Sequence, residues 1–218
     1  IGENVGRRVT ALITDMDMPL GHCIGNALEV MEAVEVLRGG GPEDLARVSL
    51  ELAANMLHLA GKGELPACRA LAREAISSGR ALEKLCQMAA AQGGDARVLE
   101  NFSLFPKAAL CREVLAEQSG YLAAVDTEAC GTASVLLGAG REKKGDAVDH
   151  AAGIVMLKKP GDRVEKGEAL AWLYTSCEER FAQGRERYLK ALTFAEEPPA
   201  PRELILARVG RDGTERPE

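Results

Sequence analysis

Residues 15–35, DMDMPLGHCIGNALEVMEAVE, decide how the rest of the chain is organised. The apolar run at 9–14 before them has the composition of a buried strand. Pro19 and Gly21 then interrupt regular structure, and a helical pattern follows Gly25. Its apolar residues recur at steps of three and four, which places them on one face: Ala27, Val30, Val34 and Leu37. The stretch is therefore predicted to be strand, loop and helix, with the loop where open α/β sheets bind ligands.

Four further helices are expected before residue 106, with only short loops between them. Three are predicted at about 42–60, 65–77 and 80–91, and Asp95 suits the N-cap of a short fourth. Apolar positions assigned to buried faces are Leu45, Val48, Leu52, Met56 and Leu59 on the first helix and Leu82, Leu85 and Met88 on the third. One strand cannot form a sheet, so the strand at 9–14 must pair with a segment outside this sequence or with a later strand.

The sequence becomes β-rich after Cys111. Short β-like runs broken by glycines are predicted as strands at 112–116, 120–125, 133–137, 153–157 and 169–174. A helix is expected from about 177 to 191 and a last strand at 204–206. Residues 211–218 are expected to form a flexible tail.

The composition excludes several classes of protein. The 218 residues carry a formal charge of -6, which argues against broad nucleic-acid binding. Neither a secretory leader nor an apolar run of membrane length is evident, so a cytoplasmic protein without a membrane partner is expected. The six cysteines form no CxxC pair and are expected to be reduced thiols, and the three histidines are too dispersed to suggest a ligand set. A first residue that is Ile1 and not Met fits truncation or processing.

The segment ALITDMDMPLGHCIGNALEVMEAVEVLRGGGP closely resembles the pyrimidine-nucleoside and thymidine phosphorylase family. The resemblance continues through 90–94, 138–141 and 161–167. It implies an α/β fold class (α+β within this chain). Residues 1–110 would be the later part of an α/β catalytic domain, and 111–210 the family's β-rich carboxyl-terminal domain, a barrel-sandwich hybrid or α/β hammerhead.

The resemblance also implies an activity. Members of the family are cytoplasmic homodimeric pentosyltransferases that split pyrimidine nucleosides with phosphate, giving the free base and a pentose 1-phosphate in nucleoside salvage. In the family, the phosphate-binding segment and the residues that hold the pyrimidine lie earlier in the chain. The present residues are therefore expected to contain no catalytic residue and to be inactive alone.

A monovalent cation site is the main site that the resemblance implies here. Matched residue by residue, its ligands are the backbone carbonyls of Leu20 and Cys23 and the carboxylate of Glu32. Hard cations take such oxygen ligands, and potassium is the expected ion, with no organic cofactor. Without the resemblance, the sequence favours a solvated helix residue at Glu32 over a cation ligand.

The loop at 138–153, GAGREKKGDAVDHAAG, is the second candidate. The resemblance places its Gly140 and Arg141 beside the substrate cleft, where Arg141 could act as a latch or attract phosphate. The alternative is a solvated basic loop. Asp15 and Asp17 could in principle serve acid–base chemistry, but loop hydrogen bonding or N-capping suits them better.

Two functions of other classes remain open. Residues 155–173, with glycine turns at Gly161 and Gly167, also resemble lipoyl and biotinyl carrier domains. The corresponding tip at 174–178, YTSCE, lacks the lysine that such carriers modify. A carrier or binding module and a non-catalytic structural domain are therefore kept as alternatives to the phosphorylase.

Overall fold

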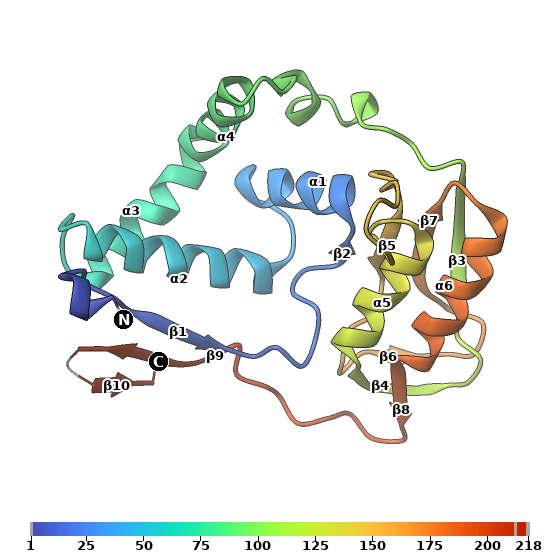
Figure 1. The fold of residues 1–218 in the computed structure, drawn as a ribbon. Coiled ribbons are helices and arrows are strands. Elements are labelled where there is room, and N and C mark those ends of the chain that lie inside the picture. The colour runs from blue at the N-terminus through green and yellow to red at the C-terminus, as the bar shows by residue number, and fades with distance from the viewer. Residues whose placement is uncertain (1, 212, 217–218) are drawn as a thin grey trace. The chain divides into compact units, whose positions relative to one another are not determined.

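The computed structural model of the chain describes residues 2–211 and 213–216 (Figure 1). Contacts within it divide the chain into two compact units. The first unit contains Ile1–Asp15, Glu35–Gly94 and Arg202–Glu218, and the second contains Met16–Val34 and Asp95–Pro201. By contacts, residues 16–34 thus group with the later part of the chain, whereas the sequence pattern groups them with residues 1–110.

The first unit is built from a small sheet and a series of helices. Its elements are η1 (Glu3–Val5), β1 (Ala11–Thr14), α2 (Glu43–Leu59), α3 (Leu65–Ser77), α4 (Arg80–Ala91), β9 (Ile205–Gly210) and β10 (Gly213–Glu215). The sheet is antiparallel with the order β1-β9-β10, and Ala11 lies opposite Val209 (Figure 1). The strand predicted at 9–14 therefore pairs with a later strand of this chain, which is one of the two predicted alternatives.

The predicted helices α2, α3 and α4 are confirmed, but their predicted buried faces are partly wrong. Met56 is 70% exposed, Met88 is 51% exposed and Leu52 is 47% exposed. The helices pack mainly on their neighbours in sequence, so each buries only a narrow stripe, which on α2 includes Val48 and Ala54. A regular apolar spacing identifies a helix, but the neighbours present decide how much of that face is covered.

The second unit combines two antiparallel sheets with two packed helices. Its strands are β2 (Cys23–Ile24), β3 (Leu110–Leu115), β4 (Gly120–Val125), β5 (Gly153–Met156), β6 (Arg163–Val164), β7 (Ala169–Thr175) and β8 (Leu192–Ala195). One sheet has the order β2-β5-β7-β3 and the other β6-β4-β8. The helices are α5 (Thr127–Leu137) and α6 (Glu178–Lys190), and η2 (Ala96–Leu99) and η3 (Phe102–Leu104) precede them. Most of the buried apolar side chains belong to this unit.

The strand predicted at 133–137 is wrong, because these residues are the last turns of α5. Asp126 is the N-cap of α5, and its carboxylate accepts a 2.9 Å hydrogen bond from the Ala129 N–H. Gly138, with φ 112°, ends the helix. A Cβ on Gly184 of α6 would lie 2.6 Å from Cγ of Leu137, so the helices approach closely. The helix that begins at the Asp126 cap therefore continues through 133–137, although the composition of these residues is typical of a strand.

The helix predicted after Gly25 is confirmed as α1 (Asn26–Leu37). Its predicted apolar face is partly wrong, since Val30 is 39% exposed, whereas Leu28 and Glu32 are buried. The carboxylate of Glu32 accepts backbone hydrogen bonds, which explains how a charged residue can be buried on this helix.

The last residues include a described strand. β10 pairs with β9 within the stretch expected to be a flexible tail, whose Asp212, Pro217 and Glu218 lie outside the described residues. In all, the chain mixes helices with strands, as the α+β prediction states. Among the described residues, no helix has the length and apolar character needed to cross a membrane.

Candidate functional site

Glu32 is the centre of the candidate cation site in the second unit. Its side chain comes from the second turn of α1 and is 9% exposed. Oε1 accepts hydrogen bonds from the N–H groups of His22 at 2.9 Å and Cys23 at 3.2 Å. The structure therefore brings Cys23 and Glu32 together, and the solvated alternative for Glu32 does not hold in this structure.

The strand register decides where the Cys23 carbonyl points. The Met156 N–H donates a 2.8 Å bond to the His22 carbonyl, while Cys23 lies opposite Val155 in the antiparallel pair of β2 and β5. In an antiparallel pair, residues that bond to the partner strand alternate with residues whose N–H and C=O point to the other side. His22 bonds to β5, so the N–H and C=O of the next residue, Cys23, both point away from β5. β2 is an edge strand. Its outer side carries Glu32, so the Cys23 carbonyl shares that side with the carboxylate.

Gly21 allows the carboxylate to lie directly against the loop. Its φ is 70°, and a Cβ built on it would be only 2.3 Å from Oε2 of Glu32. Leu20, the neighbouring predicted ligand, is 40% exposed, and no hydrogen bond reaches its carbonyl oxygen from the part of the chain that the structure describes. One carboxylate and nearby backbone carbonyls are oxygen donors that suit a hard cation. The donor set therefore fits such an ion, and Gly21 supplies the space.

The chemistry of Cys23 favours its backbone oxygen over its sulfur as a ligand. Burial, followed by the neighbouring Glu32 carboxylate, raises the pKa of the Cys23 thiol to about 12. The thiol therefore stays protonated near neutral pH, whereas metal binding through sulfur requires a thiolate. Among the described residues, no group of three or more His, Cys, Asp or Glu side chains could hold a metal ion.

The second candidate, the loop at 138–153, contacts the start of α1. Nδ2 of Asn26 donates a 2.8 Å hydrogen bond to the carbonyl of Ala139, and the Ala27 N–H donates to that of His150. This contact of Asn26 was not predicted from the sequence. The one sequence feature that could have drawn attention to Asn26 is its position at the start of the helical pattern. The loop with Gly140 and Arg141 is therefore anchored beside the helix that carries Glu32.

Gly140 and Arg141 differ in their surroundings. Gly140 is half-buried, and a Cβ on it would lie 2.7 Å from Cγ2 of Val135. Arg141 is exposed, and its side chain makes no hydrogen bond or ion pair to the described residues. The structure does not bring Arg141 and Glu32 into contact. A free guanidinium on an exposed loop can recognise an anion, as the sequence suggests.

Two glycines let the loop backbones meet. Gly25 has φ 142°, and a Cβ on it would lie 2.5 Å from the carbonyl oxygen of Ala152. Gly153 has φ 154°, and its Cβ would lie 2.3 Å from the carbonyl oxygen of Ile24. No other residue type fits either position without a backbone shift. Lys159, which sequence reasoning also missed, donates a 3.3 Å bond to the Pro19 carbonyl in the same region.

Asp15 belongs to the first unit and has a structural partner. Its carboxylate is bound by Arg202, with Nε 2.8 Å from Oδ2 and Nη2 3.0 Å from Oδ1. A two-point pair of this kind fixes both side chains. Asp17 is exposed in the following loop. The arrangement agrees with the preference for loop bonding over acid–base chemistry at Asp15.

Comparisons with known proteins show where this sequence has relatives. A family described as "Pyrimidine nucleoside phosphorylase C-terminal domain" matches residues 121–195. Proteins named pyrimidine-nucleoside phosphorylase from Bacillus subtilis and Geobacillus stearothermophilus are 46% identical over 179 residues and 44% identical over 180 residues, in each case 82% of this chain. A Staphylococcus aureus protein of the same name is 47% identical over 177 residues, or 81% of the chain. The chain spans 41% to 42% of the length of these relatives.

Proposed function

This chain is related to the carboxyl-terminal portion of the pyrimidine-nucleoside phosphorylase family, and on that premise we propose that it forms part of a phosphorolytic pentosyltransferase. In the proposed reaction, phosphate attacks the anomeric carbon of a pyrimidine nucleoside. The bond to the base breaks, and the products are the free base and a ribose or deoxyribose 1-phosphate. The observation that carries the proposal is identity of 44% to 47% to proteins of this name over about four fifths of the chain.

The proposed role of the second unit is to hold a monovalent cation, potassium by preference. Its ligands are the carbonyls of Leu20 and Cys23 and the Glu32 carboxylate. The contact between Glu32 and the Cys23 N–H and the orientation of the Cys23 carbonyl support this assignment. When bound, the ion would balance the buried carboxylate charge and link the loop to α1. The chain's own part is to keep these oxygens together through Gly21 and the β2–β5 pairing.

The loop with Gly140 and Arg141 is proposed to face the substrate, with Arg141 attracting the anionic phosphate. Its anchoring to Asn26 would couple the loop to the helix that carries Glu32. No residue of this chain is assigned a catalytic role. The expectation from the resemblance is that phosphate and base are bound by segments outside these residues, in a homodimeric enzyme.

The carrier alternative is less well supported by the structure. In carrier domains the modified residue occupies an exposed hairpin tip, but here β7 leads directly into α6. Thr175 is fully buried, and its hydroxyl donates a 2.7 Å bond to the Leu137 carbonyl. Cys177 is the N-cap of α6. We propose a barrel-sandwich arrangement for residues 111–210, and a structural role for this domain.

Activity tests the proposal directly. The 218-residue chain, and a chimera that joins it to the part of the Bacillus subtilis relative outside the matched region, would be assayed for phosphate-dependent release of uracil from uridine and thymine from thymidine. We expect no turnover by the chain alone and turnover by the chimera. A folded chimera without phosphorolytic activity would contradict the proposed function.

Potassium binding is tested separately, by thermal denaturation of the chain at increasing potassium concentration. We expect potassium to raise the melting temperature of the unmodified chain and to have a much smaller effect on Glu32→Gln. Glu35→Gln is the matched control, because it removes a charge from the same helix, where Glu35 pairs with Arg38 at the surface. If potassium raised the melting temperature of both variants equally, Glu32 would not be a ligand of the ion.

A further inference from the structure

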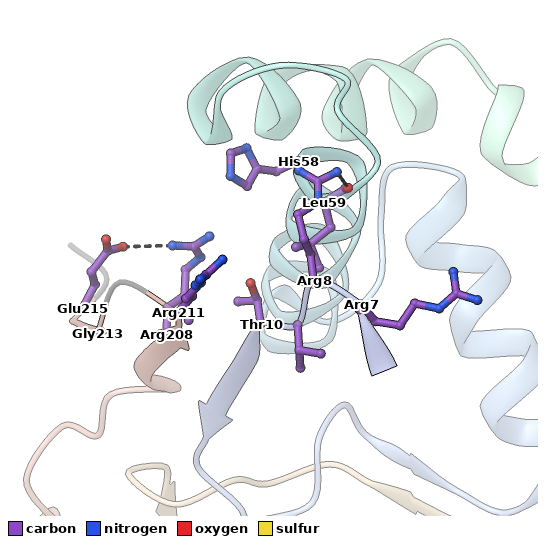
Figure 2. A pocket seen from close by; sticks show the side chains of 12 residues that line it. Arg7, Arg8, Thr10, His58, Leu59, Arg208, Arg211, Gly213 and Glu215 are labelled. Carbon is purple, nitrogen blue, oxygen red and sulfur yellow. Dashed lines mark hydrogen bonds and ion pairs between the residues drawn. The ribbon is translucent and has the colours of Figure 1, made fainter. Parts of the chain in front are cut away.

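A basic pocket of about 500 Å³ lies within the first unit (Figure 2). It is lined by residues that precede β1, by the carboxyl-terminal end of α2 and by the β9–β10 hairpin. The ionisable side chains that line it are Arg7, Arg8, His58, Arg208, Arg211 and Glu215. Among the described lining residues, four arginines thus stand against one carboxylate, in a chain whose formal charge is -6. This local reversal of charge marks the pocket as a site for an anion.

Arg208 is held in place by neighbouring polar groups. Its Nε donates a 2.7 Å hydrogen bond to Oδ1 of Asn55, which is 5% exposed, and Nη1 lies 3.1 Å from Oε2 of Glu215. The Arg208 side chain is only 18% exposed. The guanidinium is therefore fixed before any ligand arrives, and Nη2 is its one nitrogen without a bond to the described residues. Preorganisation of this kind reduces the entropy lost on binding.

Most N–H groups of the other arginines in the pocket make no hydrogen bond to the described residues and are available to a ligand. Arg8 donates through Nη2 to the Leu59 carbonyl at the end of α2 (Figure 2). The Arg211 guanidinium makes no hydrogen bond or ion pair within the described parts of the chain, and it is exposed. Arg7 is likewise unpaired there, and Figure 2 shows its side chain directed away from Arg208 and Arg211. Arg211, Arg208 and Arg8 are therefore the principal donors.

The guanidinium donors and the other lining residues indicate which class of anion the pocket can bind. Guanidinium groups bind phosphate oxygens through two parallel N–H bonds, which makes arginine the preferred residue for phosphate recognition. The described lining contains no Phe, Tyr or Trp on which a nucleobase could stack. The chemistry therefore fits a compact phosphate and not the base of a nucleotide.

We propose that this pocket binds a small phosphate-bearing anion with two or more negative charges, either a free phosphate or diphosphate or a phosphomonoester. Glu215 competes with the ligand, because its carboxylate occupies Nη1 of Arg208 in the structure. Binding of the anion would displace Glu215 from Arg208. The inference goes beyond the proposed phosphorolysis and does not depend on it, since it concerns only residues of the first unit.

Isothermal titration of the 218-residue chain tests the pocket with three probes: inorganic phosphate, pyrophosphate and ribose 5-phosphate. Pyrophosphate should bind most tightly because it carries the most charge, and added sodium chloride should weaken its binding. Ribose 5-phosphate binding more tightly than inorganic phosphate would identify a phosphomonoester as the ligand. The reverse order would identify the free anion. Absence of heat from all three at about 10 mM would overturn the proposal.

Variants assign the binding to the pocket. Arg211→Gln should weaken pyrophosphate binding roughly tenfold, the value of one charge-assisted hydrogen bond. Glu215→Gln should strengthen it several-fold, because it frees Arg208 and removes a negative charge. Arg163→Gln is the matched control: it removes one exposed positive charge from the second unit, where Arg163 pairs with Glu165. Equal effects of Arg211→Gln and Arg163→Gln, or weaker binding by folded Glu215→Gln, would refute the site.

Discussion

Nε of Arg208 donates a hydrogen bond of 2.7 Å to Oδ1 of Asn55, which lies 153 residues earlier in the chain. The Asn55 amide donates in turn to the backbone carbonyl of Glu51 at 2.8 Å, and Arg69 binds the Glu51 carboxylate at 2.8 and 2.9 Å. These contacts form one polar row that joins α3, α2 and β9. Because Asn55 is buried, each of its bonds is costly to lose.

Replacing Asn55 with alanine should lower the free energy of unfolding of the first unit by about 1–3 kcal/mol, because Arg208 loses the acceptor of its Nε. Urea denaturation measures the change. A double-mutant cycle with Arg208→Met should give a coupling of more than about 0.5 kcal/mol. Gln87→Ala, on the exposed surface of α4, is the control and should change stability by less than that amount. Strict additivity of Asn55→Ala and Arg208→Met would contradict the coupling.

Acid should weaken the first unit through Glu51. The hydrogen bond from Arg69 holds the pKa of the Glu51 carboxyl below its usual range, against the opposing effect of burial. A carboxyl whose pKa is lower in the folded state contributes stability above its unfolded pKa and loses it as the pH falls through the folded value. The stability advantage of the unmodified chain over Glu51→Gln should therefore be complete at neutral pH and shrink below about pH 4.

The pH series has a matched control in Glu74→Gln. Glu74 also pairs with an arginine, Arg80, but both side chains are 61% exposed. Exposed pairs contribute little, so this variant should differ from the unmodified chain by less than about 1 kcal/mol at every pH. A difference for Glu51→Gln that stays constant down to pH 2 would show that the Glu51–Arg69 pair is not the source.

Cys23 should resist alkylation in the native chain. Its pKa is raised to about 12 by burial and by Glu32, and the pKa of Cys130 is raised to about 12 by burial and by Asp126. Cys111 and Cys177 are exposed. Iodoacetamide at pH 8 should therefore modify these exposed thiols at least about tenfold faster than half-buried Cys23 and buried Cys130, because the thiolate is the nucleophile.

Mass spectrometry of tryptic peptides at several reaction times provides the comparison, and the urea-denatured chain, in which all six cysteines are accessible, provides the reference rates. Glu32→Gln should increase the rate at Cys23 and leave Cys130 unchanged, since it removes the charge beside only one of them. If Cys23 in the native chain reacts as fast as Cys177, the raised pKa of the Cys23 thiol is wrong.

Gly153→Ala should destabilise the second unit by roughly 3 kcal/mol. The new Cβ would lie 2.3 Å from the Ile24 carbonyl oxygen, so β2 and β5 would have to separate, and the positive φ adds strain. Gly161→Ala is the control for φ alone, because φ is 103° there and, beyond its two chain neighbours, no atom of the described residues lies within 4 Å of the added Cβ. It should cost about 1–2 kcal/mol. Equal losses in thermal denaturation would show that the close approach at Gly153 is unimportant.

The helices of the first unit could be predicted from sequence because their signals are local. Pro42 and the acidic Glu43 and Asp44 mark the start of α2, and its regular apolar spacing marks its length. The burial of Leu52 and Met56 was predicted wrongly because it depends on which segments pack against α2. The partner of β1 could only be narrowed to two alternatives, since pairing across nearly the whole chain leaves no local signal.

For the candidate site, the sequence supplied the residues but not their contacts. The loop carbonyls of Leu20 and Cys23 and the carboxylate of Glu32 suggested an oxygen site once the family resemblance was included. The bonds from His22 and Cys23 to Glu32 depend on the β2–β5 register, which a two-residue strand cannot specify by pattern. Asn26 and Lys159 were missed for a similar reason, because each contacts a segment more than 100 residues away.

The pairing of β1 with β9 imposes an order on folding during synthesis. Thr14 pairs with Ile205, so about 190 residues must be added before β1 can meet its partner, which takes roughly 10–40 s at cellular translation rates. All strands of the second unit lie between these two strands in the sequence. The second unit can therefore form on the ribosome before β9 is available to β1. Until then, the edge of β1 that β9 covers is open to pairing with another chain, and chaperone binding there would protect it.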